Sequence, residues 1–166
     1  MKKFFLFVVA LMVFASSAFA LDLGPEKAVE ALNNMVEAAP LEGVVQLYAY
    51  NEAEDLVILG VVGESIMDAA VAAHQAGKGT DDWTAYKASA TQMYDTSRKL
   101  LDTYGAEETK MCVYFLTSTD SNGQVYYAIG DDSESGECEV LLDAITSDTE
   151  VTTYEGRETE DASKAE

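Results

Sequence analysis

Residues 56–62 read LVILGVV, an apolar run that follows the polar stretch NEAED at 51–55 and ends before Gly63. Such a continuous apolar run is typical of a strand inside a sheet, where neither face meets water. The preceding run, from Gly43 to Tyr50, is also rich in β-branched and aromatic residues. We therefore predict a hairpin of two strands, the second of which is central in a sheet that helices cover on at least one side.

Helical periodicity appears on both sides of this hairpin. One amphipathic segment lies between Pro25 and Pro40, a second runs from Ile66 to about Gln75, and a third of about twenty residues ends at Gly105. Thr80 or Asp81 is the predicted N-cap of the third helix. The apolar stripe of that helix, which we expect in the core, comprises Trp83, Tyr86, Ala90, Met93, Tyr94, Ser97, Leu100, Leu101 and Tyr104.

A second hairpin is predicted from Lys110 to Thr117 and from Gln124 to Ile129, around the turn residues Asn122-Gly123. Asn-Gly between two β-rich runs favours a hairpin because both residues tolerate positive φ. Residues 138–145 form a short apolar segment that fits either a fifth strand or a final helical turn.

The order of elements predicts an α+β fold, a two-layer sandwich with an antiparallel sheet of about four strands and helices packed on one face. At the level of the fold this order is similar to profilin-like and roadblock-like domains, without their specific motifs, and a cystatin-like layout is the alternative. We expect one domain over residues 21–145 and an acidic, disordered tail over residues 146–166.

The first twenty residues have the order of a secretory signal peptide. Lys2 and Lys3 precede an apolar run, and small residues end in Ala18-Phe19-Ala20. We expect cleavage after Ala20 and a periplasmic or secreted protein without a membrane span; an uncleaved anchor is the alternative.

The chain is strongly acidic, with 30 Asp and Glu against 10 Lys and Arg and a net charge of −20. Nucleic acids and anionic membranes attract proteins through Lys and Arg, so this balance argues against both as partners. A cationic ligand or a basic protein would be attracted. The simpler interpretation is that the charge keeps an exported protein in solution.

Two cysteines in an exported chain favour a disulfide, here between Cys112 and Cys138. Two free thiols are the main alternative. A redox pair is disfavoured because it usually needs Cys-x-x-Cys, and a zinc site because it needs more Cys and His ligands than two cysteines and one histidine provide.

No catalytic or metal-binding motif stands out. His74 is the only histidine and is predicted to lie near a helix end, and no serine lies in a Gly-x-Ser-x-Gly elbow. Residues 118–123 match the start of a calcium loop, but Ile129 occupies the position of the essential glutamate, so a hairpin turn explains them better. We therefore predict no catalytic residue, metal ligand or cofactor.

Three tyrosines of the second hairpin are candidate ligand-facing residues. Tyr126 and Tyr127 are adjacent, so regular strand alternation would leave one of them facing outward unless a second layer covers that side, and the same reasoning separates Tyr114 from Phe115. An outward tyrosine on an acidic sheet suits a cationic or sugar-like ligand.

The function that the sequence favours is that of a small, exported, non-enzymatic binding or accessory protein of the cell envelope or secreted fraction. One alternative is a hydrolase-type enzyme that uses scattered carboxylates. The other is a structural or inhibitor-like protein that acts through a protein surface.

Overall fold

The computed structural model describes residues 23–77, 79–120, 122–131, 137–146 and 152–153. The predicted signal peptide lies outside these residues. The elements, in chain order, are α2 (Pro25–Ala38), β1 (Val44–Asn51), β2 (Leu56–Gly63), α3 (Glu64–Gln75), α4 (Asp81–Thr103), β3 (Lys110–Leu116), β4 (Gln124–Asp131), β5 (Cys138–Asp143) and β6 (Thr152–Thr153).

Local sequence explains where the helices begin and end. Pro25 opens α2, where its missing N–H is no loss because the first turn has no intrahelical acceptor for it. Thr80 caps α4, its hydroxyl oxygen accepting a hydrogen bond from the Trp83 amide at 3.3 Å. Gly105 follows α4 with a φ of +80°, a conformation that glycine adopts at the least cost. These helix assignments confirm the predictions made from periodicity.

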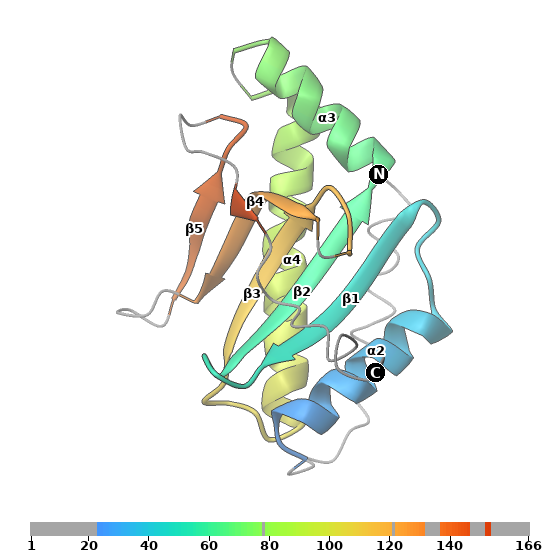
Figure 1. Ribbon diagram of the computed structural model, residues 1–166, viewed down its shortest axis with the longest axis vertical. Helices are drawn as coiled ribbons and strands as arrows, with labels where there is room; N and C mark the ends of the chain where they lie inside the picture. The colour runs from blue at the N-terminus through green and yellow to red at the C-terminus, as the bar shows by residue number, and fades with distance from the viewer. Residues whose placement is uncertain (1–22, 78, 121, 132–136, 147–151, 154–166) are drawn as a thin grey trace, which may run out of the picture.

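The five long strands form one mixed sheet in the order β1-β2-β3-β4-β5, and β6 pairs with the start of β4. Figure 1 shows α4 running behind this sheet, with α3 at one end and α2 beside β1. The predicted two-layer α+β arrangement is therefore confirmed, and the segment at 138–143 is a strand.

The sheet is not wholly antiparallel, as the sequence led us to expect. Strands β2 and β3 are parallel neighbours, with Leu56 opposite Lys110 and Val61 opposite Phe115. The physical reason is the connection between them: α3 and α4 form a crossover that brings the chain back to the end of the sheet where β2 began. Two hairpins thus join through a parallel central pair.

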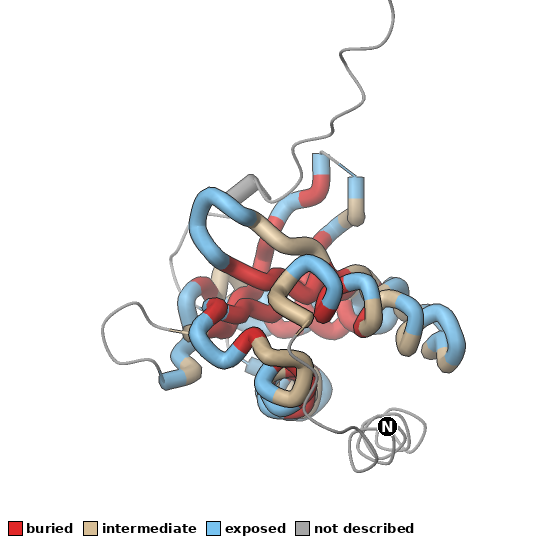
Figure 2. The backbone as a smooth tube through the Cα atoms, turned by 90° about the horizontal axis from the view of Figure 1, so that it is seen from below, coloured by how far each residue is buried: buried red, intermediate tan, exposed pale blue. Residues whose placement is uncertain are grey.

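The core has one cluster on each face of the sheet. The helix-side cluster includes Val57, Leu59, Val113 and Phe115, which pack with α2, α3 and α4. The far-side cluster, on the other face, comprises Leu56, Ile58, Cys112, Leu116, Val125, Ala128 and Leu142. Figure 2 shows the buried residues running through the strands in the middle of the molecule.

Two residues of the segment predicted as a tail lie in the sheet. Thr152 and Thr153 form β6, which pairs with Val125 and Gln124 of β4. Short strand pairing of this kind needs only backbone hydrogen bonds, so a polar segment with few apolar residues can still provide it. The other residues after Thr146 lie outside the described part of the chain.

Candidate functional site

Strand β1 forms one edge of the sheet, and helix α2 closes it. The Asn33 side chain donates from Nδ2 to the Tyr48 carbonyl oxygen at 2.9 Å, and its Oδ1 accepts from the Tyr48 amide at 2.8 Å. One carboxamide therefore offers the middle of β1 the donor and the acceptor that a neighbouring strand would supply. Edge protection of this kind prevents other chains from pairing with the strand.

Strand β5 forms the other edge, and in the described residues no strand or helix pairs with its outer side. It lies at the margin of the sheet in Figure 1. Its middle residues are exposed: Val140 retains 60% and Leu141 45% of its accessible surface, and Glu139 is also exposed. Protected edges usually carry Lys, Pro or a covering element, none of which the β5 residues provide.

A bulge explains why two adjacent apolar residues of β5 are exposed together. Val140 lies opposite Ile129 and Leu142 opposite Ala128, so Leu141 is an extra residue without a partner on β4. Leu142 packs into the far-side cluster, whereas Leu141 does not. The bulge therefore adds an exposed apolar side chain to the edge.

The end of β5 is fixed by a carboxylate that binds its own turn. Asp143 Oδ1 accepts hydrogen bonds from the Ile145 amide at 3.2 Å and the Thr146 amide at 3.0 Å, and Oδ2 forms an ion pair with Lys87 Nζ at 3.1 Å. Burial by itself raises the pKa of Asp143, but the Thr146 hydrogen bonds and Lys87 outweigh it and lower that pKa. Helix α4 and the end of β5 are thus tied together by charge.

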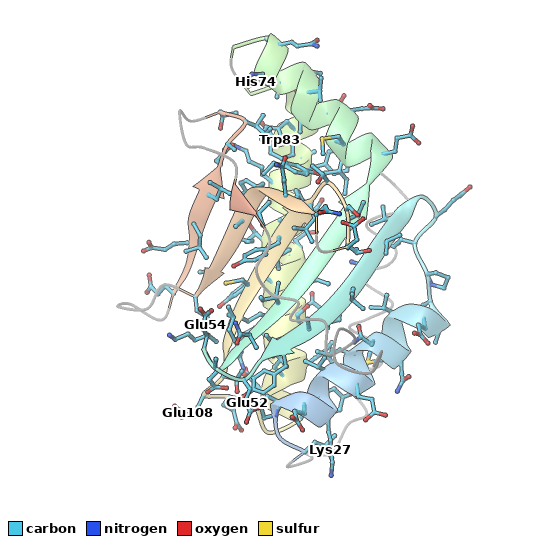
Figure 3. All side chains as sticks on the ribbon, viewed as in Figure 1. Lys27, Glu52, Glu54, His74, Trp83 and Glu108 are labelled. Atoms are coloured by element: carbon cyan, nitrogen blue, oxygen red, sulfur yellow. The ribbon has the colours of Figure 1, made fainter. Side chains whose placement is uncertain are left out.

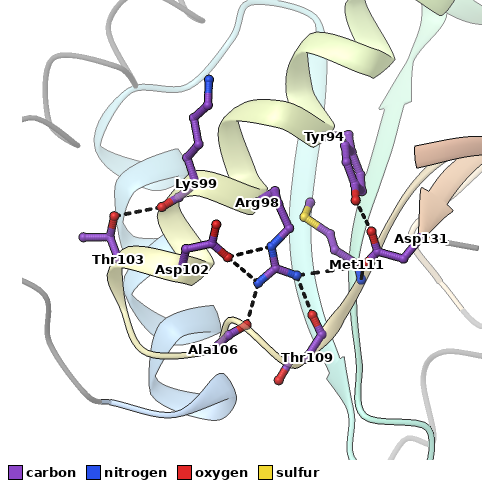
Figure 4. A network of polar contacts seen from close by, with 9 residues as sticks. All are labelled: Tyr94, Arg98, Lys99, Asp102, Thr103, Ala106, Thr109, Met111 and Asp131. Carbon is purple, nitrogen blue, oxygen red and sulfur yellow. Dashed lines mark hydrogen bonds and ion pairs between the residues drawn. The ribbon is translucent and has the colours of Figure 1, made fainter. Parts of the chain in front are cut away.

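A polar network beneath the other end of β5 is centred on Arg98 of α4 (Figure 4). Its guanidinium donates to the backbone carbonyl oxygens of Thr109 and Ala106, both at 2.5 Å, and to Asp102 at 2.8 Å. It also lies 3.9 Å from Asp131 Oδ2. One side chain therefore ties the end of α4 to the chain that leads into β3.

Asp131 completes this network at the end of β4, opposite Cys138 of β5. Its carboxylate accepts hydrogen bonds from the Tyr94 hydroxyl and, at 2.7 Å, from the Met111 amide. Burial and the Asp131 carboxylate together raise the pKa of Tyr94. Because each group in the network has partners, we interpret it as a structural brace for β4 and β5 rather than as a catalytic site.

Carboxylates surround β5. Glu137, Glu139 and Asp143 lie within or next to the strand, and the exposed Asp95 of α4 is close enough to act on Cys138. Burial, with Asp95 and Asp131 adding to it, raises the pKa of the Cys138 thiol to about 11. The potential along this edge is therefore negative.

The prediction that Tyr126 or Tyr127 faces outward is wrong. A second bulge makes Tyr126 an extra residue between the pairs Phe115 with Tyr127 and Leu116 with Val125, so strict alternation fails there. Both tyrosines are 3% exposed and pack in the helix-side cluster against Trp83, at centroid distances of 6.1 and 5.5 Å.

Among the described residues, two buried polar groups near these rings lack a hydrogen-bond partner. The indole Nε1 of Trp83 and the hydroxyl of Tyr126 are buried and have no hydrogen-bond partner. Burial alone raises the pKa of Tyr126. Tyr114, the third candidate, is half-buried and packs against the far-side cluster.

The predicted disulfide is absent: Cys112 and Cys138 are both free thiols. Cys112 belongs to β3 and the far-side cluster, whereas Cys138 belongs to β5 and packs against the helix-side cluster. Strand β4 lies between them, and a side chain at Gly130 of β4 would collide with Cys112 Sγ. Two strand spacings of about 4.8 Å each exceed the ~7 Å Cα separation that a disulfide tolerates.

His74 points outward at the end of α3, whereas Trp83 points into the fold (Figure 3). In the described ranges, His, Cys, Asp and Glu side chains form no group of three that could hold a metal ion. None of the helices described is long and apolar enough to cross a membrane.

The residues before the β4 strand form a hairpin turn, in which Asp120 Oδ1 accepts a hydrogen bond from the Asn122 amide at 2.8 Å.

Comparisons of the chain with protein families, with curated protein sequences and with solved structures found no match. The candidate site therefore depends on the geometry of the molecule alone.

The exposed edge was missed at the level of sequence. The available signal is residues 138–145, where an apolar segment that fits either a strand or a helical turn lies between acidic neighbours. Its place at an edge depends on the order of the strands in the sheet, which no local sequence pattern encodes. The bulge at Leu141 has no signature in the sequence.

Proposed function

We propose that this chain is an exported, non-enzymatic protein that binds an extended segment of a partner protein along the outer side of β5. Binding by strand addition uses the free backbone groups of a sheet edge for affinity and the neighbouring side chains for specificity. The observation that carries the proposal is the difference between the edges. The Asn33 side chain bonds to the backbone of Tyr48 on β1, whereas β5 exposes Val140 and Leu141.

The energetics fit a weak, reversible interaction. Each backbone hydrogen bond gained at the edge contributes about 0.5–1.5 kcal/mol, and burying the exposed part of Val140 and Leu141 adds about 1 kcal/mol each. Ordering a free peptide consumes much of this gain. We expect dissociation constants of about 10–1000 µM for short peptides.

The test is an NMR titration of the isotope-labelled protein with a capped peptide of alternating Lys and Val. We expect shift changes that centre on β5 and leave the middle of β1 unaffected. The same peptide with every backbone N–H methylated keeps its charge but has no donor on either edge, so it should lose binding.

Matched variants separate the two edges. The double variant Val140→Ser with Leu141→Ser should abolish most of the binding, whereas Val45→Ser, which changes an equally exposed valine of β1, should leave it unchanged. Because these side chains are exposed, their replacement should alter the free energy of unfolding by less than about 0.5 kcal/mol. Binding that survives N-methylation, or that maps to both edges, would refute the proposal.

A further inference from the structure

We infer that the segment bound by β5 is basic, with cationic and apolar side chains in alternation; this rests on the proposed function. Strand addition by itself accepts many sequences, since the backbone provides most of the affinity. The surroundings of β5 decide which sequences are preferred.

The first reason is the charge along the edge. From Glu137 to Asp143 the chain carries three acids and neither Lys nor Arg. Two basic side chains of α4 reach this part of the sheet, but Lys87 is bound to Asp143, and Arg98 is bound to Asp102 and lies beside Asp131. Their charges are therefore already balanced, and the exposed Glu139 and Asp95 set the sign of the local potential.

The second reason is the distribution of side chains between the two faces. Glu139 lies opposite Gly130, whereas Val140 lies opposite Ile129 of the helix-side cluster. Consecutive side chains of an added strand also point to opposite faces. A segment with alternating basic and apolar residues would therefore place its cations beside Glu139 and its apolar side chains beside Val140.

A second copy of this chain is a less suitable occupant. Pairing β5 with itself would bring together two strands that each carry the exposed Glu139 and have Glu137 next to them, in a protein with a net charge of −20. Like charges on neighbouring strands are destabilising. In such a dimer the apolar contact of Val140 and Leu141 would have to overcome this repulsion. A basic segment would instead be attracted by the same acidic residues.

The experiment compares three capped peptides of equal length, in which Val alternates with Lys, Thr or Glu. At low ionic strength we expect the Lys peptide to bind β5 about 10-fold more tightly than the Thr peptide, and the Glu peptide to bind more weakly still. Addition of 0.5 M NaCl should reduce the preference for Lys over Thr to about 2-fold or less. Light scattering of the protein alone measures pairing between copies.

A charge-neutralising variant tests whether Glu139 contributes to the preference for a basic segment. Glu139→Gln should weaken binding of the Lys peptide about threefold and leave the Thr peptide unaffected. Glu37→Gln removes an exposed acid of α2, beside the closed edge, and should change neither.

The outcomes distinguish the two proposals. Equal affinity for the Lys and Thr peptides at β5 would overturn the inference about charge and support strand addition. Absence of β5 shift changes with all three peptides would overturn both. Equal binding of the Lys peptide and its N-methylated form would also overturn both, since attraction would then be diffuse. A dimer formed through β5 would overturn the inference in favour of a second copy.

Discussion

The two edge strands carry similar apolar residues but differ in what lies beside them. Val45 on β1 and Val140 on β5 are comparably exposed, at 55% and 60%. On β1 a helix supplies a carboxamide that pairs with the outward backbone, and among the described residues β5 has no such partner. The difference teaches that exposed apolar side chains by themselves do not distinguish two sheet edges; the edges differ in whether a side chain pairs with the outward backbone donors and acceptors.

The largest expected effect concerns the Arg98 network, the structural brace for β4 and β5. We call the outer side of β5 the open edge and that of β1 the closed edge. Arg98→Met removes the donor for the Ala106 and Thr109 carbonyl oxygens and leaves Asp131 without its cation. We expect a loss of about 3 kcal/mol in the free energy of unfolding, because buried polar groups lose their partners. Urea denaturation measures it.

Lys99→Met is the matched control, since Lys99 is exposed and next to Arg98. It should change the free energy of unfolding by less than about 0.5 kcal/mol. Equal effects of the two substitutions would show that the network contributes little to the anchoring of β4 and β5.

The next effect opens the closed edge. Asn33→Ala removes the partner of both the amide and the carbonyl oxygen of Tyr48, a residue that is 4% exposed. We expect about 2 kcal/mol of destabilisation, since two backbone groups lose their hydrogen bonds. Hydrogen exchange of the Tyr48 amide should accelerate by more than the loss of global stability explains.

Asn34→Ala is the control for this experiment, because Asn34 is the exposed neighbour on the same helix. It should leave exchange at Tyr48 unchanged. If Asn33→Ala also leaves that exchange unchanged, the difference between the edges has another origin.

Alkaline pH gives a smaller effect at the same strand. Burial raises the pKa of Tyr48 to about 12, although the hydrogen bond with Ser97 opposes the shift. The unfolded chain therefore releases this proton from about pH 10, before the folded protein does. Stability should fall between about pH 10 and pH 12, at up to about 1 kcal/mol per pH unit from this group.

Comparison of Tyr48→Phe with the unchanged protein isolates this contribution, because Cys112 and Tyr127, whose pKa values are also raised to about 12, titrate in both. The variant should be less stable at pH 8, where it lacks the hydrogen bond with Ser97, and should lose stability less steeply above pH 10. Parallel stability curves would contradict the prediction.

The smallest effect compares the reactivity of the two thiols. Burial and nearby carboxylates raise the pKa of Cys138 to about 11 and that of Cys112 to about 12, so both should react slowly with iodoacetamide at pH 8. Cys138, on the open edge and only half-buried, should react first, and mass spectrometry follows the order. Resistance of both thiols after denaturation without reductant would show a disulfide instead.

Most of the secondary structure could be predicted because its signals are local. The stripe of α4 from Trp83 to Leu101, the apolar run of β2 and the Asn122-Gly123 turn each depend on residues close in sequence. The candidate site was harder to predict from the sequence. Regular alternation misplaced Tyr126 because a bulge depends on the register between two strands, and the cysteine prediction followed from the compartment without any knowledge of geometry.

The sequence by itself determined the acidic charge, the positions of the three helices and of strands β1 to β4, and the apolar faces that must be buried. Periodicity encodes these features directly. Tertiary structure alone decided that β2 and β3 run parallel, that the Asn33 side chain bonds to the Tyr48 backbone, and that no described strand or helix pairs with the outer side of β5. Each of these depends on contacts between residues far apart in the chain, and the closed and open edges differ through such contacts alone.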